Sequence, residues 1–296
     1  MLLKSKKIAL CGLGLLVYLN ILAWQAVFDL NSQCLEVVFF DIGQGDAVFI
    51  KTPQKHQILI DGGPSSEILE KLGKEMPFWD RTIDLIILTH PKYDHIVGLI
   101  EVLKRYKVEQ ILWTGVVYDT SYYKKWQDLL KQEKAKISIA HAGQRITWSM
   151  AYPGSGWIEI LYPFDGLEGK RVKNINNSSI VSRLVFGQNS FLFTGDILKS
   201  VERQLILAEN SGKYVSLNSD VLKVAHHGSK TSSAEEFIER VNPEIAVIQC
   251  GKNNKYGHPH QETLATLKKF DIKILRTDRD GDIKIISDGQ VFSVKK

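Results

Sequence analysis

The chain has 296 residues, of which 44% are hydrophobic and 24% are charged. This composition excludes a disordered or low-complexity protein and supplies enough apolar mass for one large domain or two small ones. The formal net charge is +5, and residues 1–30 contribute +2 of it through three lysines and one aspartate. The remaining charge is small, so the sequence does not indicate a concentrated basic face for binding nucleic acid. It still permits an anionic substrate. The three cysteines exclude a disulfide framework.

The N-terminal part contains an apolar run of 21 residues, Ile8–Phe28, without a charged residue. A helix of that length spans about 30 Å, the thickness of the hydrocarbon core of a bilayer. Three lysines precede the run and Asp29 follows it, which favours a cytoplasmic N-terminus. We therefore predict a single-pass cell-membrane anchor in residues 1–30 and an extracytoplasmic domain in residues 31–296. The alternative is a signal peptide, whose cleavage would give a secreted protein, but the run offers no good small-x-small cleavage site.

After the anchor, apolar runs and turn residues predict strands and helices in a repeated order. The first half should contain strands 35–40, 47–52, 57–61 and 85–88, helix 96–106, strand 111–113, a helix around 122–132 and strand 137–140. The second half should contain a β-rich stretch 157–194, strand 221–225, helix 234–241, strand 245–249, helix 261–270, strand 272–276 and a β segment 283–294. This order predicts one domain with two sheets and helices outside them.

Histidines and aspartates, residue types that bind metals, follow five of the predicted strands. They are Asp41, Asp46, Asp61, His90, Asp94, His95, Asp196, His226 and His227. Loops after the carboxyl ends of strands are where α/β sheets place ligands and catalytic groups. One such loop alone could be a capped turn with solvated histidines, but five strand ends of this kind predict a metal site.

The motifs His90-x-x-x-Asp94-His95, Thr-Gly-Asp196 and His226-His227-Gly-Ser resemble those of the metallo-β-lactamase superfamily. Further segments resemble the extracytoplasmic hydrolase domain of the ComEC DNA-uptake proteins, namely Asp41-Ile-Gly-Gln-Gly-Asp46, Asn176-Asn-Ser-Ser179, His-His-Gly-Ser-Lys and Asn254-Lys-Tyr-Gly-His258-Pro. The resemblance covers about residues 35–290 and does not include the large multi-helix channel region of those proteins. It implies an α/β fold, an αββα four-layer sandwich, here preceded by one transmembrane helix.

The resemblance also implies roles for individual residues. The metal ligands would be His90, Asp94, His95, Asp196 and one of His226 and His227. The groups expected to take part in catalysis are Asp94, Asp196, Lys92 and His258, although His258 could instead only stabilise its turn. Asp61 would orient a ligand histidine. The full set expected around the metal or the substrate is Asp41, Gln44, Asp46, Asp61, Asn177, Ser229 and Lys230.

Two departures from the superfamily pattern affect the metal position served by His90. The superfamily has a ligand two residues after the first histidine, usually His, or Asp in many ComEC-like domains, and this chain has Lys92 there. A protonated lysine has no lone pair and repels a dication. The histidine of the third motif is also replaced, with Asn176 or Asn177 nearby. We therefore predict one strongly bound ion rather than two, and Lys92 could act as a built-in cation that pairs with Asp196 or a substrate phosphate.

These features predict a metal-dependent hydrolase that uses zinc or manganese, since the ligands are His and Asp without Cys. The ComEC resemblance implies a phosphodiesterase or nuclease acting on DNA outside the membrane. Two alternatives remain open: a lactam or lactone hydrolase, and a catalytically impaired DNA-binding or assembly module. The expected partners are the membrane, through the N-terminal helix, and DNA or another anionic substrate. The sequence gives no indication of an obligate protein partner.

Overall fold

The structure, a computed structural model, describes residues 11–21, 34–149, 155–212 and 216–295. The chain forms two compact units, Met1–Gln33 and Cys34–Lys296. In the first unit, residues 11–21 form a helix. The predicted membrane span, residues 8–28, therefore lies only partly within the described residues, because residues 8–10 and 22–28 are outside them. Among the residues that are described, no helix has the length and apolar character needed to cross a bilayer.

The second unit contains an eight-stranded sheet with the spatial order β15-β14-β1-β2-β3-β4-β5-β6. Its strands are β1 (Leu35–Phe39), β2 (Val48–Lys51), β3 (Gln57–Ile60), β4 (Thr82–Ile87), β5 (Lys107–Trp113), β6 (Lys136–Ile139), β14 (Ile283–Ser287) and β15 (Phe292–Lys295). The pairs β1–β2 and β2–β3 are antiparallel, whereas β3–β4, β4–β5 and β5–β6 are parallel. As a result β1, β3, β4, β5 and β6 all run in one direction.

The other sheet has seven strands in the order β13-β12-β11-β10-β9-β8-β7. They are β7 (Arg145–Ser149), β8 (Gly156–Tyr162), β9 (Val181–Phe186), β10 (Asn189–Phe193), β11 (Val221–Lys223), β12 (Ile245–Ile248) and β13 (Lys273–Arg276). The four strands β10 to β13 are parallel to one another, so their carboxyl ends share one edge of the sheet.

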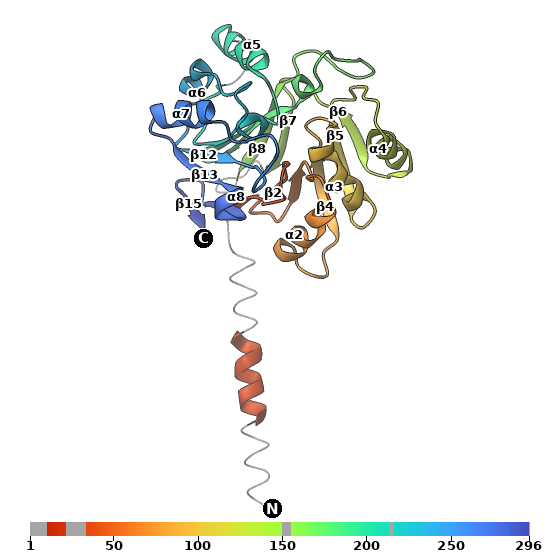
Figure 1. Ribbon diagram of the computed structural model, residues 1–296. Helices are drawn as coiled ribbons and strands as arrows, with labels where there is room; N and C mark the ends of the chain where they lie inside the picture. The colour runs from red at the N-terminus through yellow and green to blue at the C-terminus, as the bar shows by residue number, and fades with distance from the viewer. Residues whose placement is uncertain (1–10, 22–33, 150–154, 213–215, 296) are drawn as a thin grey trace, which may run out of the picture. The chain divides into compact units, whose positions relative to one another are not determined.

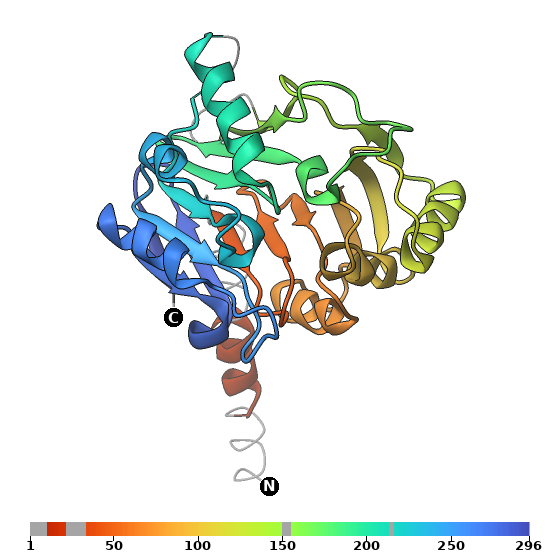
Figure 2. The ribbon, with the colours of Figure 1, turned by 45° about the horizontal axis from the view of Figure 1, so that its top comes forward.

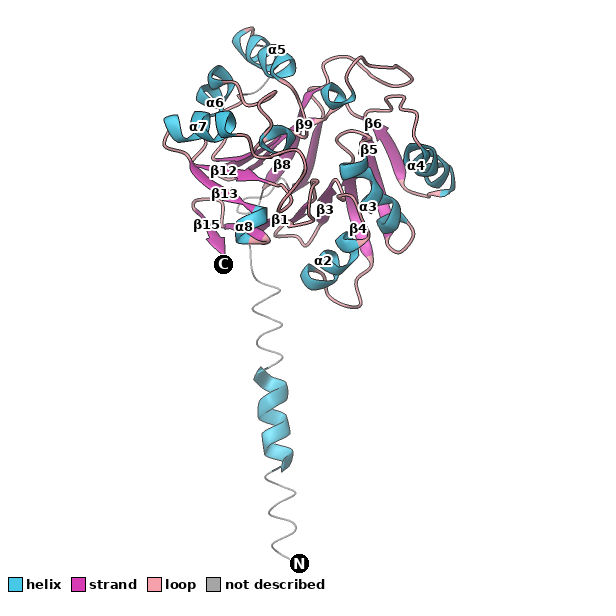
Figure 3. Cartoon of the chain, viewed as in Figure 1, coloured by secondary structure: helices cyan, strands magenta, loops and turns pink. Residues whose placement is uncertain are grey.

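Helices cover the outer faces of both sheets, and the strands lie between them (Figure 3). The helices are α2 (Glu67–Glu75), α3 (Tyr93–Leu103) and α4 (Ser121–Gln132) on the first sheet, α5 (Lys199–Asn210), α6 (Glu235–Val241) and α7 (Gln261–Lys269) on the second, and the short α8 (Thr277–Asp280), η1 (Ile175–Ser178) and η2 (Ala225–Gly228). Figure 2 shows the two groups of helices on opposite sides of the strands. The predicted α/β fold with two sheets and outer helices is confirmed.

The alternation of side chains along β1 shows why the sheet is buried on both faces. Leu35, Val37 and Phe39 pack into the core between the sheets, whereas Val38 and Phe40 pack under the helices. Successive side chains of a strand point to opposite faces, so a continuous apolar run fills two cores at once. The order of layers is therefore helix, sheet, sheet, helix.

The structure contains elements that were not expected, namely the helices α2 and α5, the short helices α8, η1 and η2 and the strand β7, and one predicted helix is shifted along the chain. The helices α2 and α5 were missed because each buries only a few side chains, Ile68 and Leu72 in α2, so the apolar stripe is narrow. The helix predicted from residue 96 begins instead at Tyr93. An acidic residue in the first turn suits the helix N-terminus, and this start places Asp94 and His95 on the first turn of α3.

Candidate metal centre

Four side chains with metal-binding atoms converge where strands of both sheets end. Asp94 and His95 follow β4, Asp196 follows β10, and His227 follows β11. One ligand atom from each of the four lies within 4.8 Å of the others. Nε2 of His95 is 3.5 Å from Oδ2 of Asp196, and Nε2 of His227 is 3.3 Å from Oδ2 of Asp94. Two ligands therefore come from each half of the fold.

Several buried atoms of this cluster lack a hydrogen-bond partner. Both carboxylate oxygens of Asp196 and the Nε2 atom of His95 are buried and make no hydrogen bond. Each such atom costs about 1–3 kcal/mol when it is left unsatisfied. Two imidazoles and two carboxylates form a donor set that divalent zinc and manganese accept. The residues present thus fit a bound divalent metal ion.

The orientation of His95 is fixed by Asp61 from behind the cluster. Oδ2 of Asp61 lies 2.7 Å from Nδ1 of His95, which leaves Nε2 directed at the cluster. The Asp61 carboxylate also accepts hydrogen bonds from the backbone N and the hydroxyl of Thr89. Close packing holds this arrangement, because a Cβ added at Gly98 would lie 1.8 Å from the carbonyl oxygen of Gly62. Only glycine lets α3 approach the loop that carries Asp61 this closely.

His227 is held by the predicted Asp46 and by two groups that the sequence did not single out, Gln249 and Lys223. Its Nδ1 atom lies 2.9 Å from the carbonyl oxygen of Gln249 and 3.2 Å from Oδ1 of Asp46. Asp46 in turn forms a fully buried ion pair with Lys223. A signal for Lys223 did exist, since it is the one charged residue in the apolar segment Val221–Ala225. The buried ammonium balances the charge of Asp46 behind the cluster.

The turn that carries the two adjacent histidines has an uncommon backbone. His226, His227 and Gly228 have φ angles of 51°, 54° and 79°, in the left-handed region. For residues with a Cβ this conformation costs on the order of 1 kcal/mol each and persists only where the surroundings enforce it. The N–H of His226 donates to the carbonyl of Gly195, next to Asp196, which ties the two ligand-bearing loops together.

His90, Lys92 and His226 also face the carboxylate of Asp196. Nε2 of His90 is 3.7 Å and Nε2 of His226 is 3.9 Å from Oδ2 of Asp196. Nζ of Lys92 lies 3.5 Å from the same oxygen and 4.0 Å from Oδ1 of Asp94. The ammonium group therefore occupies the side of the cluster that His90 and His226 face. Of the two adjacent histidines, His227 joins the four-atom cluster and His226 does not.

The charges of the cluster shift the pKa values of its histidines in opposite directions. Burial alone would lower the pKa of His227, but the carboxylates of Asp196 and Asp46 outweigh it and raise that pKa to about 9. The pKa of His95 is raised well above its usual value, because Asp196 and Asp61 outweigh the effect of burial. Burial, assisted by the neighbouring His95, holds the pKa of His90 well below its usual value. At neutral pH a cation that binds to His95 and His227 must therefore displace protons.

Two of the residues predicted near the substrate lie beside the cluster. The ring of His258 is 5.6 Å from that of His226 and 6.0 Å from that of His227. Nδ1 of His258 lies 3.4 Å from Nε2 of Gln44, whose Oε1 accepts a hydrogen bond from the backbone N of Gly251. His258 and Gln44 thus form one wall of the site.

Other predicted site residues serve the local backbone. Asp41 accepts a hydrogen bond from the N–H of Gly43 within its turn, and the hydroxyl of Ser229 contacts that of Thr231. Lys230 is exposed. The amide of Asn177 donates to the hydroxyl of Ser200 and its oxygen accepts from the N–H of Leu198, so this side chain does not reach the cluster.

Asn176, rather than Asn177, contacts the site. Its Nδ2 atom lies 3.1 Å from Nε2 of His226. The amide therefore contacts the same ring atom that faces Asp196. The sequence alone could not choose between two adjacent asparagines, because the choice depends on how the short helix η1 turns.

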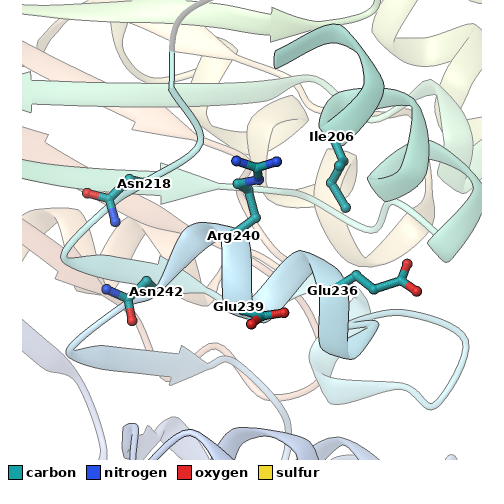
Figure 4. Close-up of a pocket in the computed structure, with 6 residues that line it drawn as sticks. All are labelled: Ile206, Asn218, Glu236, Glu239, Arg240 and Asn242. Atoms are coloured by element: carbon teal, nitrogen blue, oxygen red, sulfur yellow. The ribbon is translucent and has the colours of Figure 1, made fainter. Parts of the chain in front are cut away.

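A separate hollow of about 570 Å³ lies between α5 and α6 (Figure 4). It is lined by Ile206, Asn218, Glu236, Glu239, Arg240 and Asn242. Nε of Arg240 forms an ion pair with Oε2 of Glu209 at 3.1 Å. None of the residues of the metal cluster borders this hollow, so we do not assign the chemistry to it.

Residues 40–252 match the family described as the Metallo-beta-lactamase superfamily. The chain belongs to this superfamily. It is also 34% identical over 266 residues to ComE operon protein 3 of Bacillus subtilis, covering 84% of this chain and 32% of that protein. It is 29% identical over 296 residues to recombination protein 2 of Haemophilus influenzae, covering 96% of this chain and 33% of that protein. The predicted resemblance to ComEC-like competence proteins is confirmed, and the chain spans about a third of the length of these relatives.

A solved structure supports the fold assignment independently. The metallo-β-lactamase fold protein YhfI of Bacillus subtilis superimposes with a TM-score of 0.53 at 13% sequence identity, covering 86% of this chain and all of that one. At this level of identity the similarity establishes the fold. Members of the superfamily are generally metal-dependent hydrolases, which agrees with the cluster described above.

Proposed function

We propose that the protein is a metal-dependent phosphodiesterase that acts on DNA outside the membrane, with one resident zinc or manganese ion and Lys92 as a second, built-in cation. The observation that carries the proposal is the position of Lys92. Its ammonium group faces both Asp196 and Asp94, and the Lys92 side chain is still 28% exposed. It is therefore available both to the cluster and to an anionic group arriving from solvent.

The residues around the cluster have separable tasks in this proposal. Asp94, His95, Asp196 and His227 would hold the ion, which lowers the pKa of a bound water so that hydroxide is available near neutral pH. Lys92 stabilises negative charge that develops on the phosphoryl oxygens. Burial alone would lower the pKa of Lys92, but the carboxylates of Asp196 and Asp94 outweigh this effect and raise it. The lysine thus stays protonated while the substrate binds.

Aromatic side chains beside the site favour a nucleic acid over a small lactam or lactone. Tyr93 and Tyr256 are each 53% exposed. The Tyr93 ring lies 5.8 Å from that of Tyr122, and Tyr256 stacks on His258 with Nζ of Lys255 5.3 Å from its ring. Exposed aromatic rings next to cations are the elements with which proteins hold bases and phosphates of a strand.

The placement outside the membrane rests on the N-terminal apolar run and on the relatives. The run Ile8–Phe28 follows three lysines, as expected of an anchor with a cytoplasmic N-terminus. The names of the relatives refer to competence and recombination, which involve DNA. There are two alternatives, a lactam or lactone hydrolase and a DNA-binding module without activity. The experiment must distinguish both from a DNA phosphodiesterase.

The test uses the purified full chain in detergent. We expect about one zinc or manganese ion per chain by elemental analysis and cleavage of single- or double-stranded oligonucleotides, without turnover of lactams or lactones. Asp196→Asn should abolish both the bound metal and cleavage, whereas Lys136→Asp, at an exposed lysine of the edge strand β6, should change neither. DNA binding without metal or cleavage would instead establish the impaired module. Hydrolysis of lactams or lactones alone would refute the choice of substrate.

A further inference from the structure

The loop between α2 and β4, whose course Figure 1 shows, carries two aromatic side chains. The domain does not cover them. Phe78 is 82% and Trp79 is 73% exposed, and among the described residues no large apolar side chain is more exposed. Their ring centroids are 4.8 Å apart in an edge-to-face arrangement. Soluble proteins rarely expose two adjacent aromatic rings to water, because each ring could bury a large apolar area in a contact.

The base of this loop is firmly attached to the domain, so its aromatic tip is held outward. The N–H of Asp80 donates to the carbonyl of Pro77, and the Asp80 carboxylate accepts from the N–H of Thr82 and the side-chain amide of Gln57. Arg81 donates to the hydroxyl of Tyr106. The exposure of Phe78 and Trp79 is therefore built into the fold and does not come from a loosely held segment.

The strand directions place this loop at the edge of the sheet opposite the metal centre. The loop leads into the first residue of β4, which runs in the same direction as β1, so it lies at the edge where β1 also begins. Leu35, at the start of β1, pairs with Ser287, and the turn after Ser287 presents Val291, which is 68% exposed. The ligands, in contrast, follow the carboxyl ends of the strands. Three exposed apolar side chains thus share the edge at which the chain enters the sheet.

The sequence connects that edge directly to the proposed anchor. The apolar run ends at Phe28, and residues 29–34 are the only ones between it and β1. Six residues span at most about 20 Å when fully extended. A bilayer that holds the run is therefore within reach of this edge. Aromatic side chains, Trp above all, are enriched at the interface between lipid headgroups and water.

We propose that Phe78 and Trp79 insert into the headgroup region of the bilayer, so that the domain rests on the lipid surface with the metal centre facing away from it. The inference depends on the membrane anchoring included in the proposed function. The binding partner is the lipid itself. Anchor and loop would form two attachment points, and together they would restrict the rotation that a single attachment point permits.

The experiment places a photoreactive group in the full chain reconstituted into vesicles of phosphatidylcholine and phosphatidylglycerol. In Phe78→p-benzoylphenylalanine, irradiation should yield lipid adducts in mass spectra several-fold more often than in Tyr256→p-benzoylphenylalanine, which carries the same group beside the metal centre. Both variants should float with the vesicles and retain the metal content of the parent. The double variant Phe78→Ser/Trp79→Ser should also float, because the anchor remains.

Each readout tests a different claim. Flotation without lipid adducts at position 78, or with adducts equally frequent at position 256, would overturn the loop contact and leave the anchor intact. Cross-links from position 78 to a second copy of the chain would show that the aromatic pair is a protein interface. Failure of the parent chain to float would overturn the anchoring and with it this inference, while metal content and DNA cleavage would still be measured separately.

Discussion

Nζ of Lys92 lies 3.5 Å from Oδ2 of Asp196, on the side of that carboxylate that His90 and His226 also face. A lysine in this position supplies one positive charge and no lone pair. It therefore balances Asp196 electrostatically, and we expect it to keep a second ion from binding there.

Replacing the lysine by a ligand should open the second position. We expect Lys92→Asp to raise the metal content from about one ion to about two per chain, because a carboxylate can join His90 and Asp196 as a ligand. Elemental analysis after removal of loosely bound metal gives the stoichiometry. Lys136→Asp makes the same charge change on the surface and should leave the metal content unchanged. A Lys92→Asp protein that binds no additional metal would show that Lys92 does not occupy a ligand position.

Weakening the support of His95 should reduce metal affinity. In Asp61→Asn the partner of Nδ1 loses its charge, and metal affinity should fall about 10- to 100-fold, as is typical when a group behind a ligand histidine is changed. Competition with a chelator measures the dissociation constant. Asp128→Asn removes a carboxylate on the exposed face of α4 and serves as the control. Equal affinities of the two variants would contradict the role assigned to Asp61.

Removing one member of the buried pair behind His227 should destabilise the fold. Lys223→Met leaves Asp46 buried without its cation, and we expect a loss of about 3–5 kcal/mol in the free energy of unfolding. Urea unfolding followed by circular dichroism measures it. The double variant Asp46→Asn/Lys223→Met should recover much of the loss, because no uncompensated charge remains. Additive effects of the two substitutions would show that the pair is not coupled.

A buried carboxyl group away from the metal centre should impose a pH dependence on stability. Burial raises the pKa of Glu202 to about 7, although its oxygens accept hydrogen bonds from the N–H groups of Ala234 and Ser233. The folded state therefore binds more protons than the unfolded state between the ordinary pKa of Glu and pH 7, so the contribution of Glu202 to stability falls as pH rises through this window. Glu202→Gln cannot titrate. The difference in unfolding free energy between parent and variant should change in favour of the variant from pH 4.5 to 7, and a constant difference would refute the raised pKa.

The sequence was sufficient for most strands and for the residues that meet in the cluster, because an apolar run that ends in His or Asp indicates both a strand and a polar group at its end. It was insufficient where the answer depends on side-chain direction. Asn176 and Asn177 are adjacent and chemically identical, and only the turn of η1 decides which one meets His226. The same holds for His226 and His227, whose left-handed backbone determines which ring joins the cluster.

For a related reason, the sequence could not predict contacts between residues that are far apart along the chain. Lys223 and Gln249 contact the site from strands that are distant along the chain from the groups they support, Asp46 and His227. No local pattern encodes such a pairing. Asp61 was a candidate because it follows a predicted strand, but its role behind a histidine was predicted only through the family resemblance. The structure gives the physical reason, a 2.7 Å contact with the ring of His95.

The origin of the four ligands has a thermodynamic consequence. Asp94 and His95 follow a strand of the first sheet, and Asp196 and His227 follow strands of the second, so neither half of the fold could assemble the site without the other. An ion bound by all four would act as a cross-link between the two halves and favour the docked state by an amount that grows with the logarithm of its free concentration. Thermal unfolding of the purified protein would then report how much metal the surroundings provide, and a chain made in metal-poor conditions would be the more easily opened along the seam between its sheets.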